Sequence, residues 1–216
     1  MTRAVLGVTA LFSGIALLAN ILLSVSLPLG LAATATTLGA ILTFVLVRVD
    51  SFDRNRYLRI AVAGATAGLA ATLAYDAARA LLSQLDPSPF NPFEAIRIFG
   101  LLLLGEGART SHLMMAGTAL HLINGVCFGL AYVTLFGKEG TRSISGAVVT
   151  GISWGLFLEV FQLTLYPTWL RVTALAEFVT ISAFSHVVFG AMLGLVGRDL
   201  LRRWLQGALT TPEGGS

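Results

Sequence analysis

Charged side chains are scarce in this 216-residue sequence, and their scarcity limits what kind of protein it can be. Asp, Glu, Lys and Arg make up only 12% of the residues, whereas a soluble globular domain carries about 25%. Hydrophobic residues make up 56%, and the mean hydropathy is +0.82. This composition argues against a water-soluble core and predicts a polytopic membrane protein in contact with the lipid bilayer.

Cysteine is also nearly absent, and so is any cluster of cations. The single cysteine, Cys127, excludes an intrachain disulfide and a cysteine-based metal cluster. Its apolar surroundings favour a packing role. The net charge of +3 comes from Lys and Arg that are spread among connections, so nucleic acid is not an expected partner. No phosphate loop occurs, and the sequence does not show whether the protein is an enzyme.

Long apolar segments alternate with polar connections along the whole chain. A helix of about 20 apolar residues crosses a bilayer, so these segments predict an all-α bundle of six transmembrane helices. The first segment is longer than the apolar part of a signal peptide and is expected to remain as a span. Pro28 and Gly30 predict a tight turn after it. The six segments cover residues 4–27, 29–47, 60–82, 112–136, 144–166 and 174–197.

Lys and Arg lie mainly on one side of the predicted bundle. With the N-terminus in the cytoplasm, the connections at 48–59 and 138–142 and the end of the last span all carry cations on the cytoplasmic side. Because membrane proteins retain Lys and Arg inside, both termini are predicted to be cytoplasmic.

Three regions follow from this organisation. Residues 1–59 form a two-span hairpin with a cytoplasmic loop, residues 60–205 form a four-span core, and residues 206–216 form a flexible tail. Within the core, Asn91 and Pro92 predict the start of an extra helix over about 92–104. That helix is too short to cross a bilayer, so we expect it at the outer interface, either lying on lipid or roofing a cavity.

One short pattern occurs twice in the core. It reads His-x-x-x-Gly-x-x-x-Gly, at His121, Gly125 and Gly129, and again at His186, Gly190 and Gly194. Each copy follows an apolar segment with a single acid, Asp76 before the first and Glu159 before the second. The core is therefore predicted to be a pseudo-repeated helical hairpin, with parallel repeats related by an axis along the membrane normal.

Glycine pairs four residues apart recur in the last four spans. Small residues let transmembrane helices approach closely, so these pairs predict helix-packing surfaces. They are Gly64 and Gly68, Gly125 and Gly129, Gly151 and Gly155, and Gly190 and Gly194.

Asp76, His121, Glu159 and His186 form a candidate polar centre. Ionisable groups are costly in hydrocarbon, so four of them inside apolar spans indicate a site. With a rise of about 1.5 Å per residue, the two histidines lie at similar depth, about 14 and 18 Å from the outer ends of their spans. Three further polar residues share helical faces with this centre, namely Asn124, Gln162 and Ser182.

Three interpretations of this centre remain open. Two imidazoles and two carboxylates suit a transition metal, or two imidazoles could hold a haem, in a subunit of a redox or assembly complex. The same groups could carry protons in a small proton-coupled transporter. They could also serve only as helix contacts in a structural subunit. Other membrane subunits or a second copy of the chain are then possible partners.

The two histidine segments resemble a known type of protein. His121-Leu-Ile-Asn-Gly-Val-Cys-Phe-Gly-Leu and His186-Val-Val-Phe-Gly-Ala-Met-Leu-Gly-Leu are similar to segments of small uncharacterised bacterial inner-membrane proteins of the YagU-like type. The resemblance covers roughly spans three to six. It implies a multi-pass protein of the bacterial inner (plasma) membrane and supplies no activity or ligand. The first two spans and the helix over 92–104 would be additions to that core.

Overall fold

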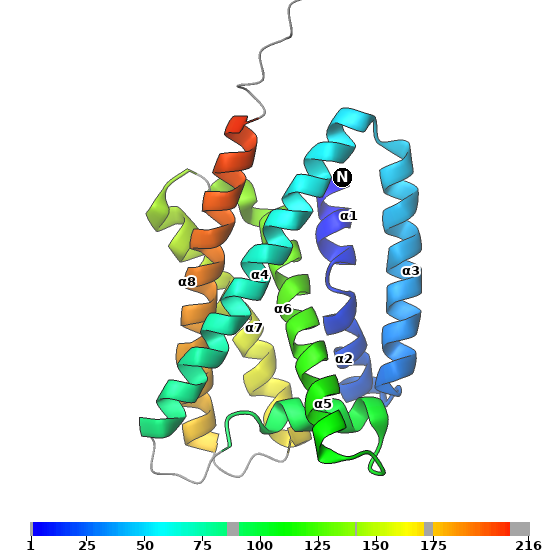
Figure 1. The fold of residues 1–216 in the computed structure, drawn as a ribbon, viewed down its shortest axis with the longest axis vertical. Helices are drawn as coiled ribbons and strands as arrows, with labels where there is room; N and C mark the ends of the chain where they lie inside the picture. Colours follow the sequence, from blue (N-terminus) through cyan, green and yellow to red (C-terminus); the bar gives the residue numbers. More distant parts are fainter. Residues whose placement is uncertain (1, 86–90, 141, 171–174, 208–216) are drawn as a thin grey trace, which may run out of the picture.

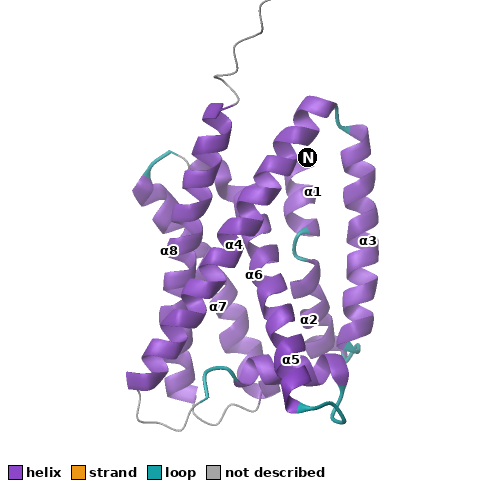
Figure 2. Ribbon diagram, viewed as in Figure 1, coloured by secondary structure: helices purple, strands orange, loops and turns teal. Residues whose placement is uncertain are grey.

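Helices make up nearly all of the described chain. The computed structural model describes residues 2–85, 91–140, 142–170 and 175–207, and within these ranges the fold is all-α, as expected (Figure 2). Most of the tail predicted to be flexible, at 206–216, lies outside the described residues. The helices are α1 (Thr2–Thr9), α2 (Phe12–Leu23), α3 (Leu27–Arg48), α4 (Ser51–Leu85), α5 (Glu94–Leu104), α6 (Thr110–Gly140), α7 (Ile144–Leu170) and α8 (Leu175–Gly207).

Five of the described helices, α3, α4, α6, α7 and α8, are long and apolar enough to cross a membrane. Their outward surfaces carry large apolar side chains, among them Phe44, Leu73 and Val160, which are 56–60% exposed. Such surfaces are costly in water and favourable against lipid. The chain is therefore a polytopic helical protein suited to contact with a bilayer.

The first predicted span, 4–27, is not one continuous helix. Where α1 ends, the amide of Leu11 donates to the carbonyl oxygen of Val8, three residues earlier, at 3.0 Å. This bond closes a tighter turn than the bond between residues four apart that an α-helix makes. The Thr9 hydroxyl also donates to the Leu6 carbonyl at 3.0 Å. α1 and α2 still follow each other in one column (Figure 1). The described residues thus contain five continuous helices of spanning length, and the sixth expected span is interrupted.

The turn predicted at Pro28 and Gly30 is wrong. The chain reverses earlier, at Ser24, which ends α2 in the left-handed conformation with φ 55°. Pro28 lies in the first turn of α3, where the missing amide hydrogen costs nothing. Gly30 lies inside α3 and faces α2: a Cβ there would lie 3.4 Å from the Ala16 carbonyl oxygen.

Helix α5 begins at Glu94 rather than at Pro92. The Asn91 carboxamide accepts a hydrogen bond from the Phe93 amide at 3.0 Å, so it closes a local turn before the helix instead of capping it. The end at Leu104 agrees with the prediction, and Gly105 follows with φ 80°. α5 then packs closely against α6, since a Cβ on Gly100 would lie 1.9 Å from the Leu113 carbonyl oxygen.

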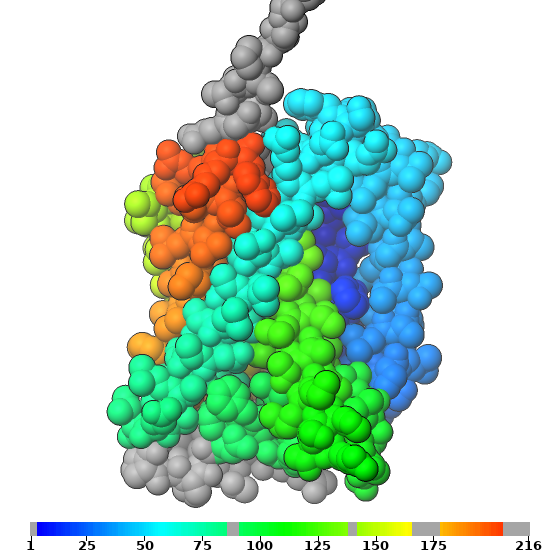
Figure 3. Space-filling model, in the orientation of Figure 1, coloured from blue at the N-terminus to red at the C-terminus, as the bar shows by residue number. Residues whose placement is uncertain are grey.

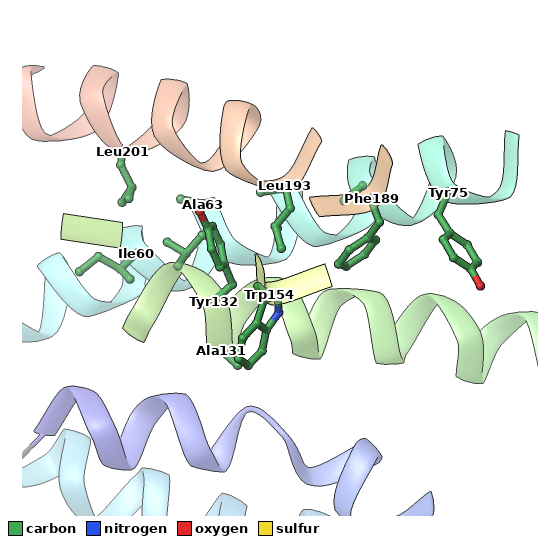
Figure 4. Packing of buried hydrophobic residues seen from close by; sticks show 12 residues of the cluster. Ile60, Ala63, Tyr75, Ala131, Tyr132, Trp154, Phe189, Leu193 and Leu201 are labelled. Carbon is green, nitrogen blue, oxygen red and sulfur yellow. The ribbon is translucent and has the colours of Figure 1, made fainter. Parts of the chain in front are cut away.

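Helix α4 is central to the bundle. It slants across the view of Figure 1 and packs against α6 and α8, while α7 packs against α8. Its inner face is built of small residues, with Ala63, Ala67 and Ala71 fully buried, and this allows its neighbours to approach. The buried cluster continues through Leu193 and Phe189 to Tyr75 at one end (Figure 4).

Helix α3 stands at the edge of the bundle. Only 6% of its most apolar stretch is buried, against 50% for α6. In the space-filling view an opening separates α3 from α1 (Figure 3). An apolar cavity of about 250 Å³ lies there, lined by residues of α1, α2, α3, α4 and α6.

Different segments of the chain form the two ends of the bundle. The N-terminal end of α1, the connection between α3 and α4 and the C-terminal end of α8 lie at one end (Figure 1). Helix α5 lies across the opposite end, called here the α5 end.

Candidate functional site

The first histidine–carboxylate pair joins α4 to α6 near the α5 end. Nε2 of His121 lies 3.0 Å and 3.1 Å from the two carboxylate oxygens of Asp76. The side chains remain partly exposed, at 16% for His121 and 25% for Asp76. An imidazole N–H shared between two carboxylate oxygens is a charge-assisted contact, so the pair can be held together with or without an extra proton on the ring.

Close glycine contacts bring these two helices together. A Cβ on Gly68 would lie 2.3 Å from the Gly125 carbonyl oxygen, and one on Gly129 would lie 2.4 Å from the Gly64 carbonyl oxygen. No side chain fits at such distances, so the backbones of α4 and α6 touch directly. This contact sets the spacing across which Asp76 reaches His121.

The second pair joins α7 to α8 and is more deeply buried. Nδ1 of His186 lies 2.6 Å from Oε2 of Glu159, and the side chains are only 10% and 3% exposed. Glycines again bring the helices together: a Cβ on Gly151 would lie 2.1 Å from the Gly190 carbonyl oxygen, and one on Gly155 would lie 2.3 Å from the His186 carbonyl oxygen. Gly194 makes the same kind of contact further along α8.

A short hydrogen-bond chain extends from this second pair. Gln162 Nε2 donates to the Ser182 hydroxyl at 2.5 Å, and that hydroxyl donates to Oε2 of Glu159 at 2.9 Å. Glu159 Oε2 thus lies next to two donors, the Ser182 hydroxyl and His186 Nδ1. Within the described chain, the other oxygen, Oε1, is buried without a hydrogen-bond partner. The carboxyl group therefore keeps one buried oxygen that can still accept a hydrogen bond.

The neighbours of His186 determine which ring nitrogen carries hydrogen. Nδ1 lies 3.0 Å from the backbone carbonyl oxygen of Ser182 as well as 2.6 Å from Glu159. A carbonyl oxygen can only accept, so Nδ1 must donate. In the neutral ring the opposite nitrogen, Nε2, is then the one that can accept a hydrogen bond.

Tyr75 links the two pairs. Its ring centroid lies 4.8 Å from that of His186, edge-on, and 6.1 Å from that of His121. Tyr75 itself is only 5% exposed. The structure thus brings Asp76, His121, Glu159 and His186 into one region, through a tyrosine that packs against both imidazoles.

A cavity of about 80 Å³ lies beside both histidines. This is room for several water molecules or one small solute. Helix α5 covers it, because Ala95, Ile96 and Phe99 form part of its wall; the helix over 94–104 therefore roofs a cavity. The other lining residues are Thr72, Tyr75, Arg79, His121, Asn124, Gly125, Phe128, Leu158, Gln162, His186 and Phe189.

Arg79 is a cavity residue that sequence reasoning missed as part of the site. It is only 4% exposed. One guanidinium NH2 group donates to the Pro92 carbonyl oxygen, and the guanidinium carbon lies 5.1 Å above the Tyr75 ring. Its position four residues after Tyr75 and three after Asp76 places it next to each of them on the helix surface.

The three supporting polar residues have different surroundings. Asn124 and Gln162 line the cavity, whereas Ser182 lies behind it and bonds to Glu159. Asn124 is 7% exposed, and its carboxamide oxygen is buried without a partner in the described part of the chain. A buried oxygen of this kind is costly unless a donor reaches it.

The expected metal or haem does not fit these residues. In the described ranges no three or more His, Cys, Asp or Glu side chains are grouped to hold a metal ion. Both carboxylates already contact imidazoles, which leaves one ring nitrogen per histidine, whereas zinc sites use three or four protein ligands. A haem held by both imidazoles would have to displace Tyr75, which packs against each of them.

Two other sequence features do not add to the site. His112, the third histidine, is exposed at the start of α6. Residues 151–155 read Gly-Ile-Ser-Trp-Gly, the spacing of a hydrolase nucleophile turn. Here, however, the segment lies within α7 and Ser153 is exposed on its outer side, so the strained strand-to-helix turn that such chemistry needs is replaced by regular helix.

No protein-family model, curated protein or solved structure matches the chain. Its site is therefore interpreted from geometry and chemistry.

Proposed function

We propose that this protein is a small proton-coupled membrane carrier that binds a small polar solute in the cavity under α5. The observation that carries the proposal is that both imidazoles, each held by its own carboxylate, line the same cavity. Histidine is the side chain whose ordinary pKa lies closest to neutral. A solute in this cavity would lie beside two imidazoles, the kind of side chain that membrane proteins use to carry protons.

Each pair can serve as a proton carrier without unfolding the site. Between Nδ1 of His186 and Oε2 of Glu159 the distance is 2.6 Å, which holds for an imidazolium facing a carboxylate as well as for a neutral imidazole facing one. The pair can therefore change its charge by one while its geometry stays the same. Ionisable groups inside a membrane commonly mark such proton routes.

The structural alternative has a specific observation in its favour. Each pair bonds two helices together, Asp76 to His121 across α4 and α6, and Glu159 to His186 across α7 and α8. Purely structural contacts would explain these bonds. They would not require a cavity that places Arg79, Asn124 and Gln162 beside both histidines, and for this reason we favour the carrier.

Proton movement with solute tests the proposal. Purified protein is placed in liposomes loaded with a pH-sensitive dye, and small carboxylates, amino acids and ammonium compounds are added outside in turn. At least one class should acidify the lumen in wild-type liposomes, and His186→Gln should abolish this because the titrating imidazole is gone. Glu159→Gln should do the same.

His112→Gln is the matched control. It removes the exposed histidine outside the cavity and should leave proton movement at the wild-type rate. If no solute class moves protons with the wild-type protein, or if His186→Gln and His112→Gln behave alike, the carrier proposal is wrong and the structural alternative stands.

We further infer that both termini face the cytoplasm of a bacterium, in the inner membrane. The placement of Lys and Arg supports this orientation, as does the position of the N-terminal end of α1 and the C-terminal end of α8 at one end of the bundle (Figure 1). The α5 end and the cavity would then lie on the outer side. A cysteine placed at Ser111, near the start of α6, should react with an impermeant thiol reagent in intact cells, while Cys127 is buried and should stay protected.

A further inference from the structure

The Arg79 guanidinium points to the charge of the solute. Arginine stays protonated at all physiological pH values. Arg79 is 4% exposed, and the described residues place no carboxylate within 4.0 Å of it. Its contacts are the Pro92 carbonyl oxygen and the rings of Tyr75 and Phe93. A carbonyl oxygen and aromatic rings partly stabilise a buried positive charge, but they carry no negative charge that would neutralise it.

We propose that the cavity binds a short-chain monocarboxylate and that Arg79 binds its carboxylate group. This deepens the proposed function, on which it rests for the identity of the solute. The guanidinium forms a planar fork that matches a carboxylate with two parallel hydrogen bonds. One negative charge on the ligand would neutralise the one cation that the described site leaves unpaired.

The rest of the cavity wall favours a ligand with a short hydrocarbon part. Ile96 and Phe99 of α5, Phe128 of α6, Leu158 of α7 and Phe189 of α8 all line it. An inorganic anion such as chloride would gain nothing from these surfaces, whereas a methyl or ethyl group would be removed from water by them. The volume of about 80 Å³ matches a ligand with only a few carbon atoms.

The charges around the cavity also couple the anion to protons. The described titratable or charged groups are Tyr75, Asp76 and Arg79 on α4, His121 on α6, Glu159 on α7 and His186 on α8, while Glu94 and Arg97 of α5 pair with each other. A histidine–carboxylate pair that holds its exchangeable proton is neutral, and a pair that has lost it carries one negative charge. When both pairs hold their exchangeable protons, Arg79 gives the site a net charge of +1. When both pairs have lost these protons, the net charge of the site is −1.

The sign of this net charge decides when the ligand binds. A monocarboxylate is attracted to the protonated site and repelled from the deprotonated one. Anion and proton therefore enter together and leave together.

Binding to the full-length protein in lipid nanodiscs tests the inference. Sodium acetate and sodium butyrate are titrated at pH 6, and the thermal unfolding midpoint is followed; sodium chloride and sodium nitrate at equal ionic strength are the inorganic anions. A saturable rise is expected with the carboxylates and not with chloride or nitrate. Arg79→Gln, which removes the positive charge but keeps a polar side chain, should weaken acetate binding about tenfold or more.

Two further variants complete the test. Arg79→Lys keeps the charge but loses the planar fork, so acetate binding should weaken while the fold is retained; unchanged affinity in this variant would overturn the proposal even if Arg79→Gln does not fold. Arg97→Gln is the control, because Arg97 pairs with Glu94 at 2.6 Å on α5 and does not line the cavity. Glu94 raises the pKa of the Arg97 guanidinium through its hydrogen bond and its charge. This variant should bind acetate like the wild type.

The two proposals fail in different ways. Arg79-dependent acetate binding without proton movement would leave the monocarboxylate site standing and reject the carrier. Proton movement with a neutral or cationic solute, unchanged in Arg79→Gln, would keep the carrier and reject the monocarboxylate. Equal binding of chloride and acetate, or no saturable binding by any of these anions, would also reject it.

Discussion

The two histidine–carboxylate pairs have the same kinds of residue and very different surroundings. The pair between α4 and α6 is open enough for 25% of the Asp76 side chain to be exposed, whereas Glu159, between α7 and α8, is 3% exposed. The buried pair also has a bonding network, through Ser182 and Gln162. The repeated sequence pattern thus provides two histidine–carboxylate pairs with the same functional groups. The packing around each pair determines how costly it is to leave its carboxylate without the imidazole.

The orientation of the rings differs as well. His121 faces its acid through Nε2 and His186 through Nδ1. The ring nitrogen that does not face the acid is therefore Nδ1 in the first pair and Nε2 in the second. The two rings are thus attached to their acids through opposite nitrogens, a difference that the repeated sequence pattern does not predict.

Replacing each histidine by alanine should give the largest difference between the two pairs in the free energy of unfolding. His186→Ala leaves Glu159 buried without its imidazole and should lower the free energy of unfolding by about 3 kcal/mol. His121→Ala leaves a carboxylate that water can reach and should cost about 1 kcal/mol. Unfolding by dodecyl sulfate in mixed micelles, followed by circular dichroism, measures both. Equal losses would show that burial does not distinguish the pairs.

Filling the glycine contacts should show a smaller difference between the two halves than removing the histidines does. A Cβ at Gly129 would lie 2.4 Å from the Gly64 carbonyl oxygen, and one at Gly190 would lie 2.3 Å from the Gly151 carbonyl oxygen. Each glycine-to-alanine change forces two backbones apart and should cost about 1–3 kcal/mol.

Gly39 provides the control for this prediction. It lies on α3, with nothing within 4 Å of a Cβ placed there, so Gly39→Ala should be neutral or slightly stabilising, since alanine favours helix over glycine. The same unfolding curves measure it. A loss at Gly39 as large as at Gly129 would show that helix contact is not the reason.

The smallest effect concerns the network that only the second pair has. Ser182→Ala removes the hydroxyl between Gln162 and Glu159 and should cost about 1 kcal/mol. Combined with His186→Ala in a double-mutant cycle, the two losses should not add, because both act on Glu159. Strict additivity would mean that Ser182 does not support the pair.

The sequence alone predicts several helices of this fold. The apolar stretches predict α3, α6 and α7 to within a few residues, because length and composition suffice to identify a helix that faces lipid. Helix α4 begins well before its predicted span, at Ser51, because the Asp50 carboxylate accepts a hydrogen bond from the Asp53 amide at 2.8 Å. That cap extends the helix into the charged connection.

Other parts depended on contacts that no local pattern contains. The break between α1 and α2 has neither proline nor an obvious helix breaker at its centre, so the first span looked continuous. Arg79 lies near the end of a predicted span, and nothing in the local sequence shows that it is buried beside Tyr75. Its role follows from the place where α5 folds back over α4 and α6.

The sequence alone determined that this chain is helical and apolar, that glycines lie where helices touch, and that each acid and its histidine belong to one hairpin. These features follow from local properties of the chain, namely the periodicity of a helix and the cost of placing polar groups in hydrocarbon. The tertiary structure decided that Tyr75 contacts both imidazoles, that Arg79 lines their cavity, and that one pair is buried while the other is open. These features arise where α4 meets α8 and α5 covers the bundle, and contacts between segments so distant in sequence depend on how all the helices pack at once.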